Sequence, residues 1–271
     1  NYNPDLIFIC IPHYLVKNYM KNLSNLNSIF VIEKPLGMNF KETKEIYRIY
    51  KDKKVFVGLN YRFFKPIHRL KNLLSKKYFG KIISIDMEIG HGGYPSMKNS
   101  WKIDFSKAGG GCLLDPGIHM LDLILYLFNL RDKDLKVNYL NKWSGFWKKK
   151  NIDECVYLNL QYKKTIIYLK VSIVQWKSKF KININGTENY ASITGRGRSY
   201  GKQRLIVGKK WSWLNGKKQH ENERLLLEDN CEKSFFDETL AVIKNSKELC
   251  NFKNYIEVKK LYNRCLNDEK K

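Results

Sequence analysis

Over the first sixty positions, short continuous apolar runs alternate with segments whose apolar residues recur at helical spacing. Continuous apolar runs are typical of strands buried on both faces of a parallel sheet. Asn39, followed by Glu42 three residues later, resembles a capping box at a helix start. The predicted strands and helices alternate in the order Leu6–Ile11, His13–Leu26, Ser28–Ile32, Asn39–Tyr50 and Val55–Leu59. This order is typical of an α/β unit with right-handed crossovers.

After Asn60 the pattern changes to apolar and polar alternation, which is typical of strands with one buried and one open face. Pro66 begins a predicted helix that reaches Leu74, and a strand follows at 82–88. Further strands are predicted at Val156–Tyr162, Thr165–Ser172, Phe180–Asn185, Ala191–Thr194 and Arg204–Val207, and helices near Lys233–Lys244 and Glu257–Leu266. We therefore predict an α/β chain: the C-terminal part of a Rossmann-like parallel-sheet domain at residues 1–59, then an α+β domain at residues 60–271 with a large, mostly antiparallel open sheet.

Composition narrows the class of protein. No apolar stretch approaches the roughly 20 residues needed to span a bilayer, and the longest one is interrupted by Asp115, His119 and Asp122. We find no signal-peptide pattern. The six cysteines form no C-x-x-C and no zinc spacing. We therefore expect reduced, structural thiols, no metal and a cytoplasmic location.

The formal net charge of +24 allows two interpretations. One is a polyanionic partner such as nucleic acid. The other is biased composition, because lysines are scattered through nearly every segment, whereas nucleic-acid domains cluster basic and aromatic residues on one element. We favour biased composition and expect no nucleic-acid partner.

The first candidate motif is Glu33-Lys34-Pro35-Leu36-Gly37, at the carboxyl end of a predicted parallel strand. Open α/β sheets bind their ligands at such ends. Lys34 precedes proline, so its backbone is extended, and a partly dry site beside Glu33 would tune its ammonium to polarise a hydroxyl or transfer a proton. The alternative is an exposed loop lysine, of which the chain has many.

The second candidate motif joins the glycines at 109–111 to Asp115 and His119. Glycines allow the backbone to approach a ligand closely. Asp115 before Pro116 is predicted to cap a helix, and His119 one turn later is a candidate general acid or base. Capping alone would also explain Asp115, and a satisfied histidine on an apolar helix would explain His119.

A third glycine-rich segment, Gly195–Gly201, looks like a phosphate-binding loop. A dinucleotide fingerprint leads from a strand into a helix, but the residues after this segment are predicted to form a strand. We reject it as the cofactor loop, and a role near an anionic substrate stays open.

Together these segments resemble the glucose–fructose oxidoreductase and inositol dehydrogenase (Gfo/Idh/MocA-like) family over nearly the whole chain. The resemblance is carried by Pro4–Pro12, Phe30–Leu36, Val57–Phe63, Trp101 with Asp104, and the glycine run with Asp115 and His119. The Gly195–Gly201 loop is similar to a loop in members that act in surface-polysaccharide pathways. This similarity implies a role in surface-polysaccharide metabolism for this protein.

The resemblance implies a role for each matching position. Lys34 would bind the reacting hydroxyl, His119 would accept its proton, and Asp115 would orient the sugar. Arg62 and Trp101 would complete the substrate site. The nicotinamide half of NAD or NADP would contact Cys10, Ile11, Pro12, Glu33, Lys34 and Asn60. The resemblance also implies a cis bond between Lys34 and Pro35.

The chain departs from the family pattern at two places. His13 and Val16 stand where members often carry Asn and His, and the sequence contains no G-x-G-x-x-G fingerprint with its acidic ribose-binding residue. The resemblance therefore implies a further βαβ unit of roughly 60–70 residues before Asn1. We expect these 271 residues alone to bind a dinucleotide weakly and to turn over little substrate. The choice between NAD and NADP stays open.

The resemblance thus implies an NAD(P)-dependent oxidoreductase that moves hydride to or from a carbinol carbon of a sugar, polyol or sugar nucleotide. The alternative is a non-catalytic basic protein on a degenerate dehydrogenase scaffold that binds nucleic acid or an anionic glycan. We also expect a homodimer or homotetramer through the open sheet, whose second face is predicted to carry Tyr157, Ile167, Tyr168 and Ile173.

Overall fold

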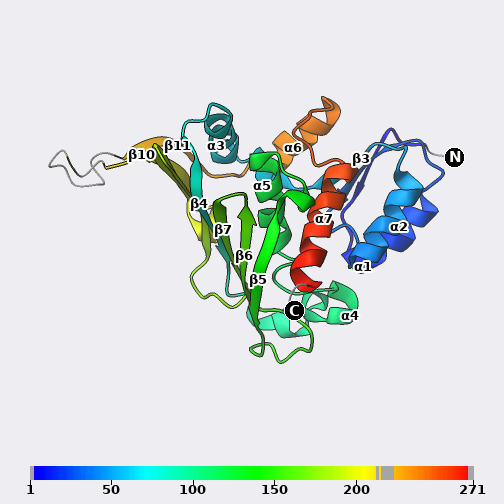
Figure 1. Cartoon of the computed structure of the whole chain (residues 1–271). Coiled ribbons are helices and arrows are strands. Elements are labelled where there is room, and N and C mark those ends of the chain that lie inside the picture. Colours follow the sequence, from blue (N-terminus) through cyan, green and yellow to red (C-terminus); the bar gives the residue numbers. More distant parts are fainter. Residues whose placement is uncertain (1–2, 212–213, 215–222, 268–271) are drawn as a thin grey trace.

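The computed structural model describes residues 3–211, 214 and 223–267, which form two sheets with helices around and between them (Figure 1). The small sheet has three parallel strands, β1 (Leu6–Ile9), β2 (Ile29–Glu33) and β3 (Val55–Gly58), in that order. Helices α1 (His13–Asn22) and α2 (Phe40–Tyr50) join them. This is the strand and helix order that the apolar runs predict.

Two local features of the small sheet differ from the prediction. Phe8 in β1 is 48% exposed, so β1 is not buried on both faces; among the described residues it pairs only with β2. At the start of α2, the Asn39 side chain accepts the Glu42 N–H at 2.9 Å, as predicted. The Glu42 carboxylate, however, accepts the N–H of Met38 rather than that of Asn39, so only half of the capping box forms.

The large sheet has eight strands in the order β11-β10-β9-β8-β4-β7-β6-β5. Among the described strands of this large sheet, only β4 and β7 pair in parallel, so the predicted, mostly antiparallel sheet is confirmed. The strands are β4 (Ile82–Gly90), β5 (Lys136–Trp143), β6 (Cys155–Tyr162), β7 (Thr165–Ser172), β8 (Lys179–Gly186), β9 (Asn189–Thr194), β10 (Gln203–Lys209) and β11 (Arg224–Asp229). We did not predict β5 and β11.

Helices cover one face of the large sheet and leave the other open. The main helices are α3 (Lys65–Ser75), α5 (Gly117–Phe128), α6 (Ser234–Ile243) and α7 (Phe252–Asn267), with α4 (Phe105–Ala108) and short 3-10 turns at η1 (Asn60–Phe63), η2 (Pro95–Asn99), η3 (Trp101–Ile103), η4 (Asp132–Asp134) and η5 (Arg198–Tyr200). In Figure 1, α5 and α7 lie between the large and the small sheet. Residues 117–127 of α5 are all buried, which explains why this helix is apolar on every side.

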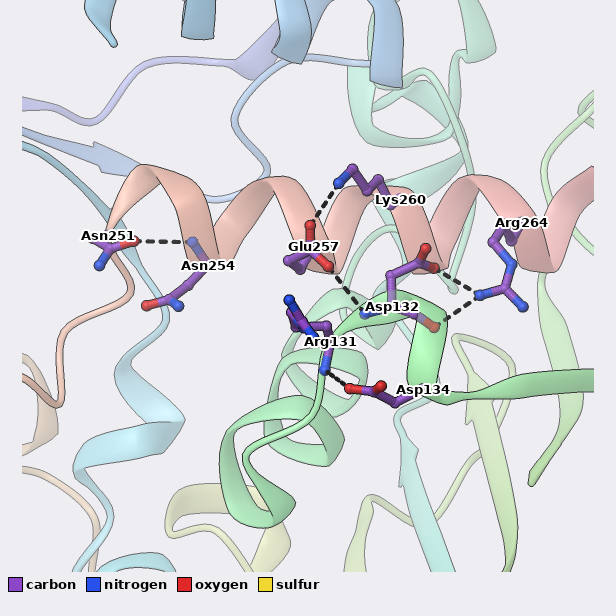
Figure 2. A network of polar contacts seen from close by, with 8 residues as sticks. All are labelled: Arg131, Asp132, Asp134, Asn251, Asn254, Glu257, Lys260 and Arg264. Carbon is purple, nitrogen blue, oxygen red and sulfur yellow. Dashed lines mark hydrogen bonds and ion pairs between the residues drawn. The ribbon is translucent and has the colours of Figure 1, made fainter. Parts of the chain in front are cut away.

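Helix α7 ties the last part of the chain to both sheets. Arg264 donates to the carboxylate of Asp132 at 3.0 Å, and Glu257 accepts the Asp132 N–H at 3.1 Å, as Figure 2 shows. On the side of the small sheet, the Tyr255 hydroxyl accepts the Leu36 N–H at 2.9 Å. The loop after β2 is therefore held beside the helices of the large sheet. The chain passes from β3 to η1 at residues 59–60, and the domain boundary placed there stays a prediction.

Candidate active site

Lys34 lies at the carboxyl end of β2, and its Nζ donates to Asp115 Oδ1 at 2.5 Å across 81 positions of sequence. Lys102 approaches the other carboxylate oxygen at 3.5 Å. Burial alone would raise the pKa of Asp115, but the charges of Lys34 and Lys102 hold that pKa well below its ordinary value. Asp115 is therefore a carboxylate that holds two ammonium groups in place.

Asp115 is not the helix cap that we predicted. Helix α5 begins at Gly117, and no side chain caps it. The carboxylate instead binds the two lysines, because an ammonium forms a stronger, charge-assisted hydrogen bond with a carboxylate than a backbone N–H does. The peptide bonds before Pro35 and Pro116 are both cis; the first was expected and the second was not.

His119 lies on the first turn of α5 and is 4% exposed. Its ring stacks on Tyr61, with 3.8 Å between the centroids and 9° between the planes. Burial, and then the charge of Lys34, lower the pKa of His119 well below its ordinary value, although Asp115 opposes the shift. Its Nδ1 has no hydrogen-bond partner among the described residues. His119 is therefore a neutral imidazole near pH 7, the form that can accept a proton.

A cavity of about 380 Å³ joins these groups at the carboxyl ends of β2 and β3. Five predicted site residues line it: Glu33, Lys34, Asn60, Asp115 and His119. Burial raises the pKa of Glu33, and the Glu33 carboxylate accepts the Lys34 N–H at 2.9 Å. Asn60 donates to Ser234 Oγ at 3.0 Å, which fixes its amide at the cavity wall.

Several further lining residues were not assigned to the site from the sequence, among them Tyr61, His91, Lys102 and Ser234, and the Gly195–Gly201 loop adds Arg196 and Tyr200. Arg196 donates to the Tyr61 hydroxyl at 2.6 Å, and its guanidinium lies 4.2 Å from the Tyr200 ring centroid. The Gly195–Gly201 loop thus reaches the cavity. It connects β9 to strand β10, which agrees with our rejection of it as a dinucleotide fingerprint. The two arginines that alternate with glycines in this loop were the feature of the sequence that could have indicated its place at the cavity.

The structure corrects our assignment of Arg62 to the substrate site. Arg62 is 4% exposed, and its guanidinium binds both carboxylate oxygens of Asp122 at 2.8 and 2.6 Å. Burial opposes the charge, but Asp122 raises the pKa of Arg62 above its ordinary value. Arg62 does not line the cavity, because a buried guanidinium needs a bidentate carboxylate partner in the core.

Four other predicted residues also lie outside the cavity lining. Trp101 packs edge-on against His13, with 4.9 Å between the ring centroids. Cys10, Ile11 and Pro12 follow β1, and His13 donates from Nε2 to the Ala108 carbonyl at 2.6 Å. The carboxyl end of β1 is therefore tied to the segment that leads into the glycine run, beside the cavity rather than in its wall.

No described helix is long and apolar enough to cross a membrane. In the same part of the chain, no group of three or more His, Cys, Asp or Glu side chains could hold a metal ion. The six cysteines, all within the described residues, form no disulfide with one another.

Residues 67–192 match the model of the GFO/IDH/MocA C-terminal domain. The chain is 27% identical over 130 residues to glucose-6-phosphate 3-dehydrogenase of Bacillus subtilis (strain 168), covering 45% of this chain and 36% of that protein. It is 28% identical over 136 residues to levoglucosan dehydrogenase of Pseudarthrobacter phenanthrenivorans, covering 46% and 34%. The matched part thus spans about a third of the length of these relatives.

Among solved structures, an inositol dehydrogenase homolog complexed with NAD+ from Azotobacter vinelandii has the same fold. The TM-score is 0.75 at 16% identity, over 98% of this chain and 76% of that one. The fold is thus shared almost throughout, and residues 67–192 match the C-terminal domain of the GFO/IDH/MocA family.

Proposed function

We propose that the protein is an NAD(P)-dependent oxidoreductase that transfers hydride between a nicotinamide and a carbinol carbon of a sugar, polyol or sugar nucleotide. The carrying observation is the convergence of Lys34, its partner Asp115 and a neutral His119 on one cavity at the strand ends. The relatives are dehydrogenases of sugars, and a structural relative was solved with NAD+. These relatives do not favour the non-catalytic alternative.

The side chains divide the proton chemistry between them. An ammonium has three donors; Asp115 takes one from Lys34, and another can bind the substrate hydroxyl. That hydrogen bond stabilises the alkoxide character that develops as the hydroxyl proton leaves. His119 lines the same cavity in its neutral form and accepts the proton. A bound nicotinamide supplies the hydride acceptor.

The residues present fit a nicotinamide. Glu33 and Asn60 line the cavity beside Lys34, and a carboxylate and an amide together offer the acceptor and donors that a carboxamide needs. Cys10, Ile11 and Pro12 follow the neighbouring parallel strand, where open sheets bind dinucleotides. We assign these five residues to the nicotinamide half.

The test follows the absorbance of the reduced dinucleotide in the natural protein, with NAD or NADP and a panel of sugars, polyols and sugar nucleotides. We expect substrate-dependent reduction that Lys34→Ala strongly slows and that exposed Lys41→Ala leaves unchanged. Absence of reduction with every pair would refute the proposal. Tight oligonucleotide binding with a steep salt dependence would then favour the basic binding protein.

We further propose that a second copy of the chain covers the open face of the large sheet. Tyr157 and Tyr168 are 51% and 45% exposed there, whereas Ile167 and Ile173 are buried, so those two were assigned to the wrong face. Neighbouring Tyr139 is 42% exposed. An apolar face of this kind is typical of an interface. Light scattering should show a dimer or tetramer that Tyr168→Glu dissociates; a monomeric parent would contradict the proposal. We also propose a cytoplasmic location, which six cysteines without a disulfide between them support.

A further inference from the structure

A second and larger cavity adjoins the candidate active site. It measures about 870 Å³, against about 380 Å³ for the first. The two cavities share His91, Arg196, Arg198 and Tyr200 in their walls. A ligand whose reacting ring lies by Lys34 and His119 can therefore extend past the arginines into the second cavity.

The far wall of the second cavity is an aromatic cluster of Phe146, Trp147 and Trp176. The Phe146 centroid lies 4.9 Å from that of Trp147 and 5.1 Å from that of Trp176. Trp176 is 70% exposed and Phe146 47% exposed. Exposed aromatic surface of this kind beside a cavity is typical of a site that stacks against a ligand.

Two glycines let the tryptophan rings lie against the backbone beyond β4. A Cβ on Gly92 would come within 2.9 Å of the Trp176 ring, and one on Gly93 within 2.9 Å of the Trp147 ring. Any larger residue would push the rings away. The Trp147 Nε1–H is buried and has no acceptor among the described residues, which leaves a polar donor at this wall.

The junction between the cavities is cationic. Arg198 is exposed and has no ion-pair partner in the described part of the chain, and the buried Nε of Arg196 has no acceptor there either. No Asp or Glu is among the described residues that line the second cavity. Two guanidiniums that form no ion pair with a carboxylate of the described residues favour an anion, and phosphate oxygens match their fork geometry.

We propose that the second cavity is the subsite for the nucleoside diphosphate of a sugar nucleotide. Along the two adjoining cavities, Lys34 and His119 come first, the arginines follow, and the aromatic cluster comes last. This order matches the sugar, the diphosphate and the base of such a molecule. A neutral oligosaccharide would use the aromatic rings but leave the arginines uncompensated, and a free polyol would leave the second cavity empty. The inference rests on the proposed function and names its substrate class.

Calorimetric titration with uridine diphosphate and thymidine diphosphate tests the subsite without any nicotinamide. We expect at least one of them to bind, and to bind more tightly than inorganic pyrophosphate and maltose. Trp176→Ala should raise Kd about 5- to 100-fold, as the loss of one base–aromatic stack does. Arg198→Ala should weaken both diphosphates and remove much of their salt dependence.

The matched controls are Trp211→Ala and Arg69→Ala, which replace exposed residues of the same types outside the cavity. Both should leave Kd unchanged. Binding of neither diphosphate, binding that Trp176→Ala and Arg198→Ala leave intact, or equal binding of maltose would each overturn the subsite. Diphosphate binding that both variants weaken, without any hydride transfer, would uphold the subsite and refute only the proposed reaction.

Discussion

Removal of either member of the Arg62–Asp122 pair should strongly destabilise the fold. The side chains are 5% and 1% exposed, and the guanidinium makes a third hydrogen bond to the Glu248 carbonyl at 3.1 Å. Arg62→Met leaves an unpaired buried carboxylate, and Asp122→Leu leaves an unpaired buried guanidinium. Breaking such a pair costs about 3–5 kcal/mol, a large part of the 5–15 kcal/mol that typically holds a domain folded.

The double variant Arg62→Met/Asp122→Leu should behave differently, because it buries no charge. Replacement of a whole buried pair by apolar residues is often neutral, and the lost bond to the Glu248 carbonyl costs about 1 kcal/mol. We therefore expect the double variant to unfold close to the parent, far from the sum of the two single variants. Such non-additivity is the signature of a structural pair.

Urea unfolding followed by circular dichroism measures the free energy of unfolding of all four proteins, provided that the m-value stays constant. The reasoning would be refuted by an Arg62→Met variant as stable as the parent. If Arg62→Met kept its stability and raised KM, the result would support the original assignment of Arg62 to the substrate site. A double variant as unstable as the sum would also contradict the paired role.

Three further predictions concern single side chains. In steady-state assays of the natural protein, Lys34→Ala should lower kcat about 10²–10⁴-fold, because this is the usual effect of losing an acid–base partner. A kcat equal to that of Lys41→Ala would show that Lys34 takes no part in the mechanism. Because burial lowers the pKa of His119, the acidic limb of the pH profile of kcat/KM should lie below pH 6.5. This limb should disappear in His119→Asn. A limb that persists in the variant would show that another group accepts the proton. Burial lowers the pKa of fully buried Lys259 from 10.5 to about 7, so between these pH values the unfolded chain holds a proton that the folded chain lacks, and stability should rise with pH. Urea unfolding of Lys259→Met should show a flatter profile and higher stability at pH 7, and a variant that is less stable there would count against this reasoning.

The local pattern of apolar and polar residues predicted most of the strands, because burial of one face of a strand makes apolar residues recur at every second position. Strands β6 and β7 alternate clearly, with Val156, Leu158, Ile167 and Leu169 buried against the helices. Strand β5 has only Val137 and Leu140 buried among eight residues, so its alternation is weak and we missed it. An edge strand that is largely exposed carries little periodic signal.

The site was only half predictable for a different reason. Lys34, Asp115 and His119 stand in motifs, but the role of Asp115 depends on Lys34 and Lys102, which no local rule connects to it. Arg62 follows a predicted strand end, as a ligand-binding residue would. Its partner Asp122 is 60 positions away in an apolar helix, and only the packed core shows that the two charges meet.

The position of α7 also constrains the order in which the chain can mature during synthesis. The N–H of Val57 in β3 donates to the Cys250 carbonyl at 2.9 Å, and Tyr255 holds Leu36. The ribosome needs about 10–40 s at its usual rate to cover the interval between Gly58 and Phe252. Throughout that time the nascent β2 and β3 lack their last neighbour. A premature stop before α7 would therefore leave the earliest-made sheet incomplete, and chaperones would encounter its uncovered surface first.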